Sequence, residues 1–229
     1  MKSEHNNQIQ RLLNRAAACI EKGDLDRAES LLSEMLDIDT SNPEALYNLS
    51  VLYIRTNKHE DAVPLLQKII ASPLTSVDII QVKLLLAYSF LSLERHAKCA
   101  PLLISILNAV PAHLTALSLL GYYYEKIGNI QKAIETYRSI VSYDADNAHA
   151  HNSLAYLLAV SDTDLNGALS SARISIRKDP DNPAYCDTIG YIYMKLGRAD
   201  MARKFLKNAQ QKMPESDIIR QHIHELLRI

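Results

Sequence analysis

The sequence predicts an all-α fold of antiparallel helix pairs, and three observations support this prediction. One small side chain recurs in helix-forming segments at intervals of 34, 37, 34, 35 and 34 residues: Ala28, Ala62, Cys99, Ala133, Ala168 and Ala202. A second small residue stands twelve or thirteen positions before each of these: Ala16, Ser50, Ala87, Gly121, Ala155 and Gly190. Such a period is typical of stacked helical units, and no stretch shows the alternation of a strand.

The residues at the expected helix ends agree with this period. Asn42-Pro43 and Asn182-Pro183 place a capping side chain just before a proline in the first helical position, so each predicts the start of a first helix. Residues that tolerate a positive φ fall between the two helices of a pair, where one helix must end before the next begins: Gly23, Gly128, Gly197 and Asn57.

These signals divide the chain into six helix pairs at about residues 8–42, 43–76, 77–113, 114–147, 148–182 and 183–216. Residues 217–229 have apolar side chains near helical spacing and predict a C-terminal helix that caps the last pair. Extra residues at 72–76 and 162–166 predict two longer loops. Pro64 and Pro101 each remove a backbone donor, so we expect them to delay the start of their second helices.

Two stretches resemble the tetratricopeptide repeat most closely: Leu120-Gly121…Tyr124…Gly128…Ala133…Tyr137 and Ile189-Gly190…Tyr193…Gly197…Ala202…Pro214. The resemblance covers roughly residues 8–216. It implies a right-handed superhelical α-solenoid in which the first helices line a concave groove and the second helices form the outer wall. A binding site is therefore expected on the first helices.

One first-helix position carries tyrosine in four consecutive repeats, at Tyr88, Tyr122, Tyr156 and Tyr191. Tyrosine offers an apolar ring and a hydroxyl at low entropic cost, which suits a recognition surface. We predict that these rings form a stripe that contacts a partner protein or peptide. The alternative, that they fill gaps between neighbouring first helices, stays open. Polar side chains that could bond the backbone of an extended peptide are Asn14, Asn48, Asn152 and Asp187.

No residue pattern indicates catalysis, a metal site or a cofactor. The chain has no nucleophile elbow, phosphate loop or zinc-protease motif. His149 and His151, like His222 and His224, are two positions apart, so on a helix their side chains point away from each other. We therefore predict a non-enzymatic protein with neither a metal nor a cofactor.

Composition limits the partners and the compartment. The 25 basic and 26 acidic residues give no net charge that would attract nucleic acid. The polar N-terminus and the lack of an apolar run of about 18 residues predict neither a secretory signal nor a membrane span. The three cysteines lie far apart, which favours a reducing compartment. We expect a cytoplasmic protein.

The middle of the chain has few charges. Residues 77–120 contain only five Asp, Glu, Lys or Arg residues, and residues 148–161 contain none. Burial between helices and a surface for a partner or for self-association both explain this composition.

The leading functional hypothesis is a scaffold or adaptor that holds a partner peptide or helix in the groove. The alternative is a subunit of a membrane-associated assembly similar to pilus-biogenesis or envelope lipoproteins, whose signal is absent from this chain.

Overall fold

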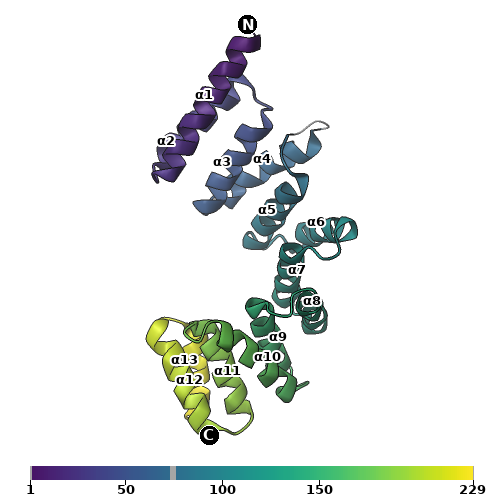
Figure 1. Cartoon of the computed structure of the whole chain (residues 1–229), viewed down its shortest axis with the longest axis vertical. Helices are drawn as coiled ribbons and strands as arrows, with labels where there is room; N and C mark the ends of the chain where they lie inside the picture. Colours follow the sequence, from purple (N-terminus) through teal and green to yellow (C-terminus); the bar gives the residue numbers. More distant parts are fainter. Residues whose placement is uncertain (1, 73–75, 229) are drawn as a thin grey trace. The chain divides into compact units, whose positions relative to one another are not determined.

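The computed structural model describes residues 2–72 and 76–228, which form thirteen α-helices and no β-strand (Figure 1). The all-α prediction is therefore confirmed. The chain divides into two compact units, Met1–Pro111 and Ala112–Ile229, which are described separately. The first unit contains α1 (Lys2–Glu21), α2 (Leu25–Ile38), α3 (Pro43–Arg55), α4 (His59–Ala71), α5 (Ile79–Ser92) and α6 (His96–Ala109).

The second unit contains seven helices: α7 (Leu114–Lys126), α8 (Ile130–Tyr143), α9 (Ala148–Val160), α10 (Leu165–Lys178), α11 (Pro183–Lys195), α12 (Ala199–Lys212) and α13 (Asp217–Leu226). Within each unit, every helix packs against the next one along the chain. First helices also contact one another, since α3 touches α5 and α11 touches both α9 and α13. Equivalent positions on these neighbouring first helices therefore lie near each other.

The helix ends have the caps that the sequence predicts. The Asn42 side chain accepts a hydrogen bond from the Ala45 N–H (2.9 Å), and the Asn182 side chain accepts from the N–H groups of Ala184 (3.0 Å) and Tyr185 (3.4 Å). The four predicted turn residues have a positive φ between 59° and 77°: Gly23, Asn57, Gly128 and Gly197. Glu94 and Asp162 adopt the same left-handed conformation, which their residue types do not predict.

The recurring small residues are buried between the helices of each pair. All six members of the second-helix column are fully buried: Ala28, Ala62, Cys99, Ala133, Ala168 and Ala202. A Cβ atom at Gly121 would lie 2.7 Å from Tyr137 Cζ, and one at Gly190 would lie 2.8 Å from Leu206 Cγ. The absence of a side chain at these two positions allows the paired helices to approach each other.

Every second helix begins three residues before its buried small residue. Pro64 and Pro101 lie inside α4 and α6 and do not delay these helices, so that expectation is wrong. Each proline only removes the bond to the carbonyl four residues earlier, which the rest of the helix tolerates. The connection between α9 and α10 is one residue longer than the other turns within pairs, as predicted. In the other predicted loop, residues 73–75 lie outside the described residues.

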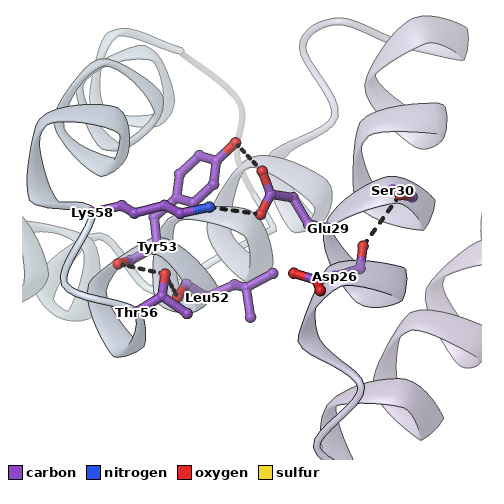
Figure 2. Close-up of polar contacts among 7 residues, drawn as sticks. All are labelled: Asp26, Glu29, Ser30, Leu52, Tyr53, Thr56 and Lys58. Carbon is purple, nitrogen blue, oxygen red and sulfur yellow. Dashed lines mark hydrogen bonds and ion pairs between the residues drawn. The ribbon is translucent and has the colours of Figure 1, made fainter.

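A carboxylate in α2 ties the first helix pair to the second (Figure 2). Glu29 accepts hydrogen bonds from the Tyr53 hydroxyl (3.2 Å) and the Lys58 ammonium (3.1 Å). Burial, with the Glu29 charge adding to it, raises the pKa of Tyr53. This tyrosine therefore stays a neutral donor, and the contact sets how α3 and the turn after it lie against α2.

The cysteines allow a direct check of the helix packing. Burial raises the pKa of Cys99 to about 12 and also raises the pKa of Cys186, so both thiols stay protonated at pH 8. We expect DTNB to react with the partly exposed Cys19 in the native chain and with all three cysteines in denaturant. Cys99 reacting as fast as Cys19 under native conditions would contradict the packing of α6.

Candidate functional site

Three aromatic rings form a row across the second unit. Tyr156 of α9 and Tyr191 of α11 have ring centroids 6.0 Å apart, and Tyr191 stacks on His222 of α13 at 4.4 Å. Two of the four predicted tyrosines are thus side by side, as the repeat register requires. However, Tyr191 is only 9% exposed, while Tyr156 is partly buried. The C-terminal end of this row is covered by α13.

The carboxylate of Asp187 also contacts α13. Asp187 and His222 are both buried, and Asp187 Oδ1 lies 2.9 Å from His222 Nδ1. This contact joins α11 to α13. It occupies the carboxylate of Asp187, which the sequence suggests as a peptide-binding side chain. In this structure, Asp187 and Tyr191 hold the terminal helix and are not open to a partner.

Tyr122 is the exposed member of the predicted tyrosine set in the second unit. It lies on α7 and is 43% exposed, with the Lys126 ammonium 5.2 Å from its ring centroid. One turn along α7, Glu125 accepts a 2.6 Å hydrogen bond from the buried hydroxyl of Tyr137. Burial raises the pKa of both Glu125 and Tyr137. The exposed ring therefore stands on a helix fixed by a buried polar contact.

Asn152 has an unpaired acceptor beside the row formed by Tyr156, Tyr191 and His222. It lies one helical turn before Tyr156, so the two side chains share a face of α9. Its Oδ1 atom is buried and accepts no hydrogen bond from the described part of the chain. A buried acceptor without a donor costs about 1–3 kcal/mol. In this structure, the Asn152 Oδ1 atom is therefore closed to a partner.

The first unit has one exposed tyrosine of the predicted set. Tyr88 on α5 is 44% exposed, and its ring meets the edge of the His59 ring with centroids 5.5 Å apart. His59 is buried at the start of α4, where its Nδ1 lies 3.4 Å from Ser89 Oγ. The buried histidine fixes one side of the Tyr88 ring and leaves the rest in solvent.

A hollow of about 260 Å³ opens on the first helices of this unit, lined by Leu13, Ala17, Ile20 and Asn48 among others. Ala17 occupies the position that carries tyrosine in the four later repeats, and its small side chain leaves this space. The Nδ2 of Asn48 donates to the Glu44 carbonyl at 2.8 Å, so its Oδ1 is the atom offered to a ligand. Asn48 is one of the predicted polar side chains, whereas the hollow itself is not predicted by the sequence.

Asn14 lies outside this hollow. Its exposed side chain accepts a hydrogen bond from Gln10 Nε2 at 3.1 Å, one turn earlier in α1. In the charge-poor middle, Leu86 and Phe90 are buried, whereas Ile104 and Val110 of the α6 region are exposed. Burial thus explains part of the composition, and self-association through the exposed part stays a prediction.

The histidine pairs have separate partners. His149 Nδ1 lies 2.9 Å from the Tyr185 hydroxyl, whereas His151 Nε2 lies 3.0 Å from the Ala145 carbonyl. Within residues 7–72 and 76–228, no group of three His, Cys, Asp or Glu side chains is arranged to hold a metal ion. No helix in the same ranges is long and apolar enough to cross a membrane.

Similar proteins share this architecture. A TPR repeat-containing protein of Pseudomonas aeruginosa is 28% identical over 112 residues, which cover 49% of this chain and 19% of that protein. Cellulose synthase operon protein C of Pseudomonas fluorescens is 25% identical over 214 residues, which cover 89% of this chain and 16% of that protein. The chain therefore spans less than a fifth of the length of either relative.

Two solved structures match nearly the whole chain in fold. PilF of Pseudomonas aeruginosa has a TM-score of 0.77 and 15% identity, with 97% of this chain and 99% of that chain covered. PilW, a type IV pilus biogenesis factor, has a TM-score of 0.75 and 15% identity, with 94% and 98% covered. Sequence models of the tetratricopeptide repeat match residues 20–87, 114–147 and 183–211. The chain belongs to the tetratricopeptide repeat family.

Proposed function

We propose that the chain is a non-enzymatic scaffold that binds a partner peptide or helix on its first helices. The observation that carries this proposal is the exposure of Tyr88 and Tyr122, at 44% and 43%, on helices whose other large apolar side chains are buried or partly buried. Large aromatic rings at such positions are the residues that most often dominate protein interfaces. The exposure of these two rings supports the binding interpretation for them, whereas the burial of Tyr191 against His222 supports the packing interpretation for that ring.

The surrounding atoms suggest the chemistry of the partner. In the second unit, the exposed Tyr122 ring offers apolar contact. In the first unit, the hollow beside Ala17 accepts one apolar side chain, with Asn48 Oδ1 as a neighbouring acceptor. We therefore propose a partner segment whose apolar side chains contact both surfaces and whose free backbone donor meets Asn48 Oδ1.

The test compares two exposed tyrosines. The partner is captured from native extract, purified, and titrated against Tyr122→Ala and Tyr143→Ala variants. Tyr143 lies at the end of the second helix α8 and is 55% exposed, so it is a matched control outside the first helices. We expect Tyr122→Ala to weaken binding about tenfold or more, the scale of an interface hot spot, and Tyr143→Ala to leave it unchanged.

A second variant tests the first unit. Ala17→Phe fills the hollow from its edge, so we expect weaker binding with little change in the thermal melt, because Ala17 is exposed. Equal affinities for the wild type, Tyr122→Ala and Ala17→Phe would reject the first helices as the binding surface.

The full-length fold likeness to PilF and PilW motivates a second proposal, that the partner belongs to a membrane-associated assembly. Cell fractionation tests it, because the chain should then sediment with membranes and leave them when the partner is deleted. We also propose a reducing, cytoplasmic location, because the three cysteines lie far apart in the sequence and do not suit a disulfide framework.

A further inference from the structure

A second surface lies away from the groove residues, between α12 and α13. It is a hollow of about 230 Å³ with an apolar floor of Leu206, Ile223, Leu226 and Leu227 and a basic rim of Arg203 and Lys207. Leu227 is 72% exposed, the largest value among the exposed apolar side chains of the described residues. An open apolar floor of this kind needs a reason in an otherwise regular fold.

The repeat register supplies the reason. Helix α13 begins 34 residues after α11, so it takes the place of a first helix in a seventh pair. The residues 34 positions before Ile223, Leu226 and Leu227 are Ile189, Ile192 and Tyr193, and all three are buried. Helix α12 covers them, since Phe205 stacks on Tyr193 with ring centroids 5.8 Å apart. Through residue 228, no second helix covers the same positions of α13.

We propose that this hollow docks an amphipathic helix of a partner protein whose apolar stripe is flanked by acidic side chains. The apolar stripe follows from the register, because a second helix occupies the same place in the preceding pair. The acidic flanks follow from charge complementarity, because both charged residues of the lining, Arg203 and Lys207, are basic. His222 of α13 is turned to α11, and the docking face, to which Ile223 and Leu227 belong, lies beside it.

One residue makes this docking weaker than pairing inside the fold. The position equivalent to Gly190, 34 residues later, is the exposed His224. Gly190 lets Leu206 of α12 come into close contact with α11, whereas an imidazole at 224 holds an incoming helix further out. We therefore expect a partner helix to bind reversibly, and a smaller residue at position 224 should increase its affinity.

The experiment uses the full chain and a fluorescent, stapled 14-residue helix with the sequence of α2. This probe carries Asp26, Glu29, Glu34 and Asp37 beside an apolar stripe. The matched control probe has lysine at these four positions. We expect the acidic probe to bind and the lysine probe to bind about tenfold more weakly or not at all.

Two chain variants locate the docking site. Leu227→Glu, at an exposed position, should lower the probe affinity about tenfold or more, because it places a charge on the apolar floor. His224→Ala should raise the affinity. Tyr122→Ala should leave probe binding unchanged, which separates this site from the groove and makes the two proposals fail independently.

Failure of the acidic probe to bind, equal binding of both probes, or binding unaffected by Leu227→Glu would overturn the proposal. Sedimentation velocity of the chain alone tests whether a second copy of the chain occupies the hollow instead. A dimer that Leu227→Glu converts to a monomer would mean that the hollow is filled by a second copy of this chain, which also overturns the proposed acidic partner helix.

Discussion

Replacing Cys99 with arginine should lower the free energy of unfolding by about 4 kcal/mol or more, the range reached when an unpaired charge is buried in a core. Cys99 is fully buried in α6, at the small-residue position where the second helix of the third pair meets its neighbours. The guanidinium would need space and solvent, and this interface provides neither. A thermal melt followed by circular dichroism measures the effect.

Cys99→Ala is the matched control. The other five members of this column are alanines, so the shorter side chain should be accepted with a small change in the melt. A melt of Cys99→Arg that matches the wild type would show that residue 99 is not in a helix interface and that the register of the third pair is misplaced.

Deleting residues 217–229 should destabilise the second unit by about 3 kcal/mol or more and make it associate. The deletion removes the buried side chains of Ile219, His222 and Leu226, and each buried apolar residue contributes about 1.5–3 kcal/mol. It also leaves the Asp187 carboxylate without its histidine and uncovers Tyr191. Urea unfolding and sedimentation velocity measure the two effects.

A point variant separates the contribution of the His222 contacts from that of the whole helix α13. His222→Ala removes the stacking on Tyr191 and the bond to Asp187 while α13 stays present, so it should destabilise less than the deletion. Ile218→Ala, at an exposed position of α13, should change nothing measurable. A deleted chain that stays monomeric and melts with the wild type would mean that residues 217–229 are a peripheral tail.

The sequence predicts the fold well because a helix pair depends on features that a one-dimensional pattern records. The small residues at 28, 62, 99, 133, 168 and 202 are all fully buried, and the asparagine caps are present. Positive φ at Glu94 and Asp162 is not predicted, because the turn imposes that conformation on whichever residue stands there. The effect of Pro64 and Pro101 is overestimated for a similar reason, since neighbouring helical bonds hold both helices.

The candidate site is predicted less completely. The register identifies Tyr88, Tyr122, Tyr156 and Tyr191 as equivalent, but exposure depends on what lies beside each ring. Tyr191 is covered because the next helix carries His222, and no spacing rule relates that histidine to a tyrosine column. The hollow beside Asn48 is lined by the small side chain of Ala17, at the position that carries tyrosine in four later repeats. Side-chain size at a shared position is therefore the signal that would have found it.

Site-specific photo-crosslinking in cells tests the central claim, partner binding on the first helices, most directly. A photoreactive phenylalanine analogue replaces Tyr122 in one variant and Tyr143 in another, both at exposed positions. The account predicts a crosslinked partner at position 122 and none at position 143. Crosslinks at position 143 alone would contradict it, because they would place the partner on the second helices.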